Sequence, residues 1–204
     1  MSLPTTTIRR VLRHTRRIEA QAFEREDGLW DIDARLTDSK TRPTPFGSGT
    51  RSAGEPIHDL WLRLTIDTEF NVVDAHAVSA AVPYPGHCDT ISHAYKKLVG
   101  LNLVKGFRKA VAEMLAGTAG CTHLTDLASL LPTAAIQAFA GDVIPLREGH
   151  DDNEEQPPFQ LGRCHALRID GPAVVQYYPR WAPKAGVPSI EAAYQRLKSE
   201  EEHA

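Results

Sequence analysis

The stretch at residues 29–37, LWDIDARLT, decides the fold class because its apolar and polar residues alternate from Trp30 onward. A period of two is typical of a strand with one face buried and the other in water. The preceding run IEAQAFER (18–25) and the turn sequence at 26–28, which ends in Gly28, complete a predicted β-hairpin.

Two more runs extend this pattern along the chain. IHDLWLRLTI (57–66) alternates in the same way, and FNVVDAHAVSA (70–80) follows after a short turn at 67–69. The Thr-, Ser-, Pro- and Gly-rich stretch 38–56 is predicted to be a loop. Together these runs predict an antiparallel sheet of at least four strands.

Helical patterns replace the alternation after residue 80. We expect helices over 89–98, 106–117 and 122–141, the last with a kink or restart at Pro132. The fold class predicted is therefore α+β, with an antiparallel sheet of four or more strands and helices packed on one face.

The 204 residues suit one large domain with flanking segments. The expected parts are a basic leader, a single α+β domain and a C-terminal segment with an amphipathic helix (1–16, 17–180 and 181–204). His14 is expected to be solvated in the leader. The stretches 162–171 and 173–179 are expected to be extended.

The charge balance excludes one class of partner. Lys plus Arg number 23 and Asp plus Glu 26, a net charge of 23 − 26 = −3, whereas binding to nucleic acid needs a basic surface. No secretory leader or membrane-length apolar run is visible, so we expect a cytoplasmic protein with reduced thiols. Its partner would be an unidentified small molecule or protein, and its oligomeric state stays open.

The three cysteines lie in distinctive contexts. Cys88 and Cys121 each precede a predicted helix, and Cys164 is followed by His165. A helix N-terminus stabilises a thiolate, which is the form that binds metals and attacks electrophiles. A neighbouring histidine would supply a second ligand or a general base.

These contexts predict a zinc or iron site whose ligands come from separate elements. The candidate metal ligands are Cys88, Cys121, Cys164, His58, Asp59, His123 and His165. Their spacing contains no compact CxxC pair, and each cysteine could equally be a small buried hydrophobe. No HExxH or GxSxG motif occurs, which sets aside conventional metalloproteases and serine hydrolases with a nucleophile elbow.

Several motifs resemble an uncharacterised bacterial family, the domain of unknown function 2889. The matching segments are GEPIHD (54–59), YKKLVGLNLVKGF (95–107), GCTHL (120–124) and CHAL (164–167). This resemblance extends over most of residues 8–180 and implies no assigned activity.

The part at 56–140 is also similar in layout to iron–sulfur scaffold proteins of the IscU and NifU type. That resemblance implies an IscU/SufE-like core with added strands, and Asp59, Cys88 and Cys121 as ligands for zinc or a cluster. The chain departs from the scaffold pattern because Ile57 and Gly120 stand where that family has a cysteine and a histidine. His58, His123, and Cys164 or His165, are the available replacements.

Three hypotheses follow from these observations. The first is a metal or cluster site built from the candidate ligands above. The second is a thiol enzyme or sulfur carrier in which Cys121 is the nucleophile or persulfide acceptor and His123 the base. The third is a non-catalytic binding module that uses its acidic loop or N-terminal arm.

Overall fold

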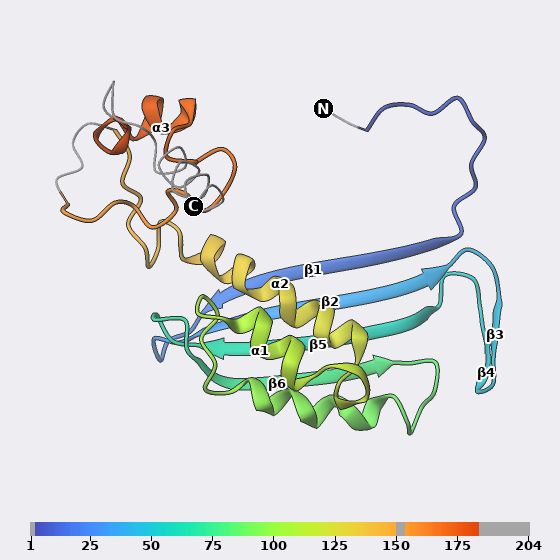
Figure 1. Cartoon of the computed structure of the whole chain (residues 1–204). Helices are drawn as coiled ribbons and strands as arrows, with labels where there is room; N and C mark the ends of the chain where they lie inside the picture. The colour runs from blue at the N-terminus through green and yellow to red at the C-terminus, as the bar shows by residue number, and fades with distance from the viewer. Residues whose placement is uncertain (1–2, 150–153, 184–204) are drawn as a thin grey trace, which may run out of the picture. The chain divides into compact units, whose positions relative to one another are not determined.

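A four-stranded antiparallel sheet forms the centre of the computed structural model, which describes residues 3–149 and 154–183. The strand order is β1-β2-β5-β6 (Figure 1). These strands are β1 (His14–Glu24), β2 (Trp30–Lys40), β5 (Pro56–Ile66) and β6 (Val72–Ala81). Each strand pairs antiparallel with its neighbour in the sheet, which confirms the predicted antiparallel sheet of at least four strands.

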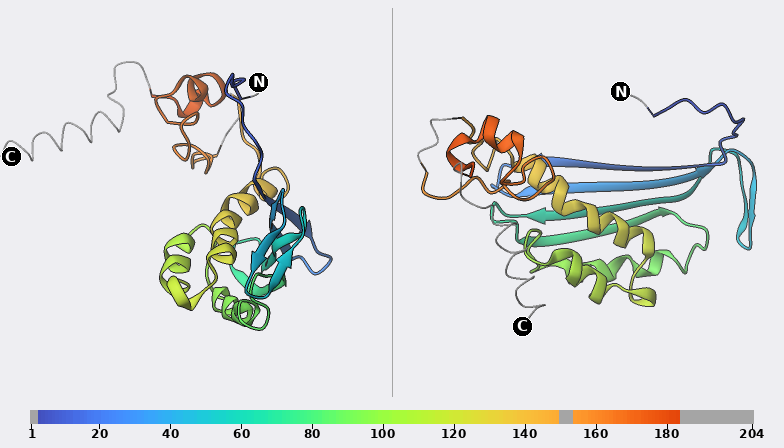
Figure 2. Two further views of the ribbon diagram at one scale, coloured as in Figure 1. Left: turned by 90° about the vertical axis from the view of Figure 1, so that its right-hand side faces the viewer. Right: turned by 45° about the horizontal axis from the view of Figure 1, so that its top comes forward.

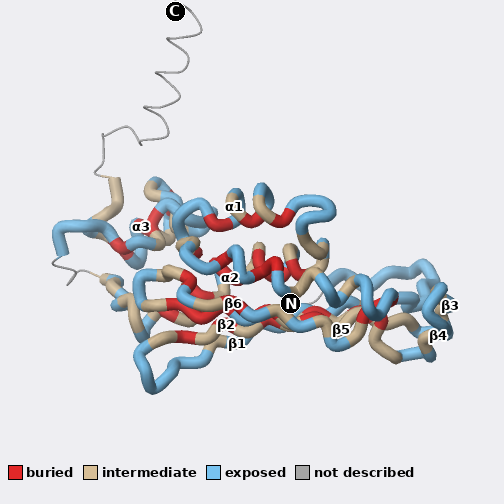
Figure 3. Tube along the Cα trace, turned by 90° about the horizontal axis from the view of Figure 1, so that it is seen from below, coloured by how far each residue is buried: buried red, intermediate tan, exposed pale blue. Residues whose placement is uncertain are grey.

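The alternation in β2 positions the core. Its even-numbered residues from Trp30 to Leu36 are buried, and Leu36 lies between Ile18 of β1 and Leu60 of β5. The odd-numbered residues point to the other face and are partly exposed. Buried positions therefore gather between the sheet and the helices (Figure 3).

Within the described residues up to Val143, the helices lie on this apolar face of the sheet (Figures 1 and 2). Four helical segments follow β6: η1 (Asp89–Leu98), α1 (Phe107–Met114), η2 (Gly117–Ala119) and α2 (Thr122–Phe139). α2 packs across β1, β2 and β5, and η1 packs against β6. The fold is therefore α+β with helices on one face, as predicted, and α2 continues through Pro132.

Three predictions about local structure are wrong. Within the expected loop 38–56, β2 continues to Lys40, and β3 (Thr44–Phe46) pairs with β4 (Gly49–Arg51) in a short hairpin. Residues 162–171 form turns instead of a strand. Residues 173–179 fall mainly in α3 (Pro172–Tyr177), whose first residue is a proline, a favoured helix start, and η3 (Pro179–Trp181) follows.

The chain divides into two compact units, Met1–Val143 and Ile144–Ala204. The second unit has a small apolar cluster of its own around Leu161, Val174 and Tyr178. The amphipathic helix predicted within 181–204 lies outside the described residues. Among the described helices, none combines the length and apolar character needed to cross a membrane.

Candidate functional site

A buried carboxylate lies at the end of the core face of β2. Asp38 occupies the even-numbered position after Leu36, and its side chain is only 4% exposed. The register between β2 and β5 shifts between Asp38 and Ser39, where His58 lies opposite Asp38. A bulge of this kind redirects side chains at the end of a strand pair.

Four hydrogen bonds satisfy the Asp38 carboxylate. Arg16 donates from Nε to Oδ1 over 2.9 Å and from Nη2 to Oδ2 over 2.8 Å. His14 Nε2 lies 2.8 Å from Oδ1, and His58 Nδ1 lies 3.0 Å from Oδ2. Burial alone would raise the pKa of Asp38, but the bonds from Arg16 and His14 outweigh it and lower this pKa to about 2.

Two imidazoles lie face to face beside this carboxylate. The ring centroids of His58 and His123 are 3.9 Å apart with a tilt of 34°. His123 Nε2 lies 3.9 Å from Asp38 Oδ2, the same oxygen that His58 contacts. Burial lowers the pKa of both histidines, so the neutral imidazole, which is the metal-binding form, is favoured at neutral pH.

The start of α2 positions His123. Gly120 extends the chain immediately before the helix, where an added Cβ would lie 2.5 Å from the carbonyl oxygen of Leu115. Tyr95 anchors the next residue: its hydroxyl donates to the Cys121 carbonyl over 2.8 Å and accepts the Cys121 N–H over 3.0 Å. Thr125 Oγ1 lies 2.9 Å from the same hydroxyl. The first turn of α2 is therefore fixed against η1.

Cys121 lies next to His123 on the side away from Asp38. Its Sγ is 3.9 Å from His123 Nδ1, whereas Nε2 of that ring is the nitrogen directed at Asp38. The three side chains thus follow one another as thiol, imidazole and carboxylate. Cys121 is partly buried and occupies the N-cap of α2, so it directly precedes a helix, as predicted.

The donors at this site converge enough to hold a metal ion. Asp38, His58 and His123 each offer one ligand atom, and these atoms lie within 4.8 Å of one another. Within the described part of the chain, this is the one such group of three. Two imidazoles and a carboxylate suit zinc or iron(II), and ligand bonds of about 2.0–2.2 Å would need a small contraction.

The structure distributes the other predicted ligands elsewhere. Asp59 lies on the opposite face of the sheet, where Arg35 donates to both of its oxygens over 2.8 and 2.7 Å. Cys88 occupies the position before η1 and is partly exposed. Cys164 and His165 are exposed and belong to the second compact unit. Of the predicted ligands, only His58 and His123 lie in the described group, with Cys121 alongside.

Three residues of the site were missed from the sequence. His14, expected to be solvated, bonds to Asp38, although its side chain stays 46% exposed. Arg16 belongs to the stretch taken as a leader, and β1 begins inside that stretch. The available signal was Asp38 itself, because it continues the apolar series of even-numbered positions in β2. A carboxylate at such a position needs partners inside the fold.

Comparison with known proteins bears on the family of this chain. Neither the curated proteins nor the solved structures contain a match, so the scaffold-like layout of 56–140 stays a prediction. The family model described as "Protein of unknown function (DUF2889)" matches residues 14–137, which include β1 and nearly all of α2. The chain therefore belongs to the DUF2889 family.

Proposed function

We propose that this protein binds a divalent metal ion, zinc or iron, through Asp38, His58 and His123. The observation that carries the proposal is the convergence of one carboxylate oxygen and two imidazole nitrogens within 4.8 Å. Oδ2 of Asp38 is the oxygen assigned as ligand because it lies nearest to both histidines, at 3.0 Å and 3.9 Å. Three protein ligands leave further positions for water or substrate.

Arg16 and His14 support the site from the other side of the carboxylate. Both bond to Oδ1, and Arg16 also reaches Oδ2, so the carboxylate is oriented before any metal arrives. Partners of this kind orient a ligand and tune the metal. The positive charge of Arg16 also opposes a second cation, so we expect moderate metal affinity.

The bound ion would supply Lewis acidity if it is zinc, or redox chemistry if it is iron. The residues of the chain would have different roles in binding the ion. His58 and His123 would hold the ion as neutral imidazoles, and Asp38 would contribute the negative charge. Cys121, 3.9 Å from His123 Nδ1, lies where it can fix the ring's tautomer.

Metal titration of the full chain tests this proposal. Protein stripped with chelator is titrated with Co²⁺, whose visible absorption reports coordination, and then with Zn²⁺ in competition. We expect one ion per chain, and about 100-fold weaker binding or more in His58→Gln and His123→Gln. His76→Gln is the matched control, because His76 is 59% exposed and bonds to Asp74 outside the group. Equal binding by wild type and His58→Gln would overturn the proposal.

A second function is favoured by the order thiol, imidazole, carboxylate. Cys121, His123 and Asp38 follow one another with gaps of 3.9 Å each, which suits a cysteine nucleophile with a histidine base. In such a step the Cys121 thiol would give its proton to His123, the sulfur would bond to an electrophilic carbon or sulfur of the substrate, and the group displaced from that atom would leave with its bonding electron pair. This is the thiol-enzyme alternative of the sequence analysis, now with a carboxylate as third member.

Alkylation separates this second function from the first. The native protein is treated with iodoacetamide across a pH series, and each cysteine is quantified by peptide mass spectrometry. Cys164, which is exposed, serves as the internal standard. The thiol function predicts that Cys121 reacts at lower pH than Cys164 and that His123→Gln removes this difference. Parallel pH profiles for the two cysteines would contradict it.

A further inference from the structure

The outer edge of β1 is a long row of unused backbone groups. β1 lies at the edge of the four-stranded sheet and pairs over all eleven residues with β2, without a bulge (Figure 1). Within residues 3–143, the only backbone hydrogen bonds found for His14–Glu24 are those to β2. Such an edge is a template for pairing with another strand.

β1 also lacks most of the devices that normally protect an edge. It contains no proline, and its apolar side chains include Ile18 and Phe23, which are 47% and 48% exposed. A charged side chain on an edge strand normally opposes pairing with another chain, but Arg16 is turned toward Asp38. The charges left at the middle of the strand are Arg17 and Glu19. Glu19 lies opposite Arg35 of β2 and interacts with it electrostatically, while both Arg35 side-chain bonds go to Asp59.

We propose that β1 pairs antiparallel with β1 of a second copy of this chain, with Ile18 facing Ile18 of that copy. In an antiparallel pair of identical strands centred on Ile18, a residue on one strand faces the residue equally far from Ile18 on the other side in the second copy, so their two numbers sum to 36. Arg17 then faces Glu19 of the second copy, and Glu19 faces its Arg17. The outer pairs, Arg16 with Ala20 and Thr15 with Gln21, contain no like charges.

The neighbouring registers are less favourable. Centring on Glu19 would place Glu19 against Glu19, and centring on Arg17 would place Arg17 against Arg17. Like charges directly opposite each other in a strand pair are destabilising, whereas opposite charges contribute favourably. Of the registers centred on residues 17, 18 and 19, charge complementarity therefore favours the one centred on Ile18, and the opposite charges of this one strand suit a second copy as partner. Pairing would join the two sheets into one and hold the strand that carries His14 and Arg16.

Analytical ultracentrifugation of the full chain over a concentration series tests the proposal. We expect wild type to form dimers and Arg17→Glu or Glu19→Arg to weaken dimerisation by about tenfold or more. Lys109→Glu is the matched control for net charge, since Lys109 is 83% exposed on α1. Circular dichroism establishes that each variant is folded.

Mixing the two single variants gives the decisive result. In a mixture, the glutamate introduced by Arg17→Glu faces the arginine introduced by Glu19→Arg in the other chain. The unchanged Glu19 of the first variant faces the unchanged Arg17 of the second, so heterodimers should form where each variant alone is monomeric. The double variant R17E/E19R should likewise recover self-association. A monomeric wild type, a dimer unaffected by Arg17→Glu, or no rescue on mixing would each overturn the proposal.

Discussion

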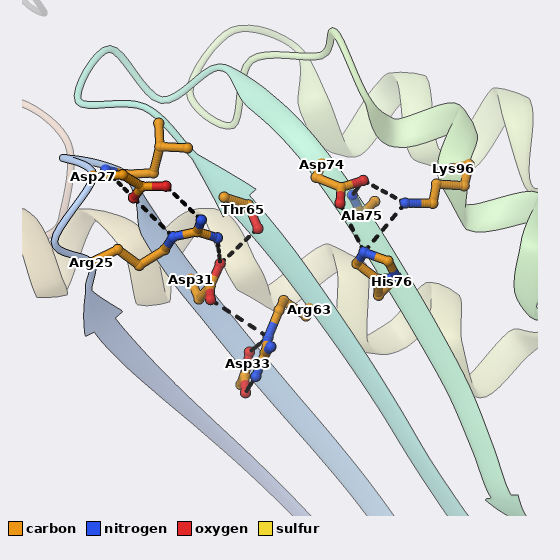
Figure 4. A network of polar contacts seen from close by, with 11 residues as sticks. Arg25, Asp27, Asp31, Asp33, Arg63, Thr65, Asp74, Ala75, His76 and Lys96 are labelled. Carbon is orange, nitrogen blue, oxygen red and sulfur yellow. Dashed lines mark hydrogen bonds and ion pairs between the residues drawn. The ribbon is translucent and has the colours of Figure 1, made fainter.

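The two faces of the sheet both carry an aspartate bound to an arginine, but in different surroundings. On the helix face, Asp38 is 4% exposed and accepts bonds from Arg16, His14 and His58. On the open face, Arg63 binds Asp33 through two bonds of 2.6 Å, and Asp33 is 15% and Arg63 48% exposed (Figure 4). Each carboxylate is more buried than the arginine that binds it, and Asp38 is the more deeply buried of the two, although Arg16 itself is 37% exposed.

This contrast shows how the candidate metal site differs from the solvated ion pairs on the open face. Along the open face, the carboxylates pair with basic side chains, as Asp74 does with Lys96 and with the imidazole of His76 (Figure 4). On the helix face, burial and three donors hold one carboxylate beside two stacked imidazoles. Exposed ion pairs contribute little to stability, whereas breaking a buried pair leaves uncompensated polar groups. Similar residue types therefore have different energetic and chemical roles.

Asparagine substitution on the two faces should give the largest difference. Asp38→Asn leaves Arg16 and two histidines facing an amide, so we expect a loss of about 2–4 kcal/mol in the free energy of unfolding. Asp33→Asn affects a pair whose arginine is 48% exposed, so the charge left on Arg63 stays solvated and the change should cost less than about 1 kcal/mol. Urea unfolding followed by circular dichroism measures both. Equal losses would mean that burial does not distinguish the faces.

Lowering the pH should remove the contribution of Asp38 to the free energy of unfolding over a defined pH range. Its pKa is about 2 in the folded chain against 3.8 in the unfolded chain, so the folded state binds fewer protons. Stability is therefore full above about pH 4 and declines as the pH falls toward 2, by about 2 kcal/mol. The wild type minus Asp38→Asn difference should shrink over this range in urea titrations. A difference that stays constant from pH 5 to pH 2 would refute this assignment.

The smallest effect should come from Asp74, and salt should reveal it. The bond from Lys96 lowers the pKa of Asp74 to about 2, yet the Asp74 side chain is 44% exposed and its pairs are screened by solvent. Asp74→Asn should cost about 0.5 kcal/mol at low ionic strength and almost nothing near 1 M salt. The cost of Asp38→Asn should change little with salt. A salt-independent Asp74 effect would argue against this view of the open face.

Local patterns predicted most of the sheet and the helices. Alternation from Trp30 to Leu36 identifies β2 because every second side chain of a strand enters the same environment. Cys121 was correctly expected at the start of a helix. Gly120, which has no Cβ, lets the backbone before that helix pass close to the carbonyl oxygen of Leu115. The short hairpin at β3 and β4 was missed because its polar, Pro- and Gly-rich residues carry no alternation.

The candidate site was only half predictable. His58 and His123 were proposed from their neighbours in sequence, together with Cys121. Asp59 looked equivalent to them, but strand geometry turns its side chain to the opposite face from His58. Adjacent residues of a strand point in opposite directions, so a pair such as His58-Asp59 does not form a joint site.

The sequence by itself determined the four long strands, the helices between residues 89 and 141, and which face of the central strands is apolar. Those properties depend on the order of residues within a few positions. Only the tertiary structure decided that Asp38, His58 and His123 meet, since their approach depends on strand register, on the bulge after Asp38 and on where α2 begins. A shift of one residue in the pairing would turn Asp38 into solvent and remove the site.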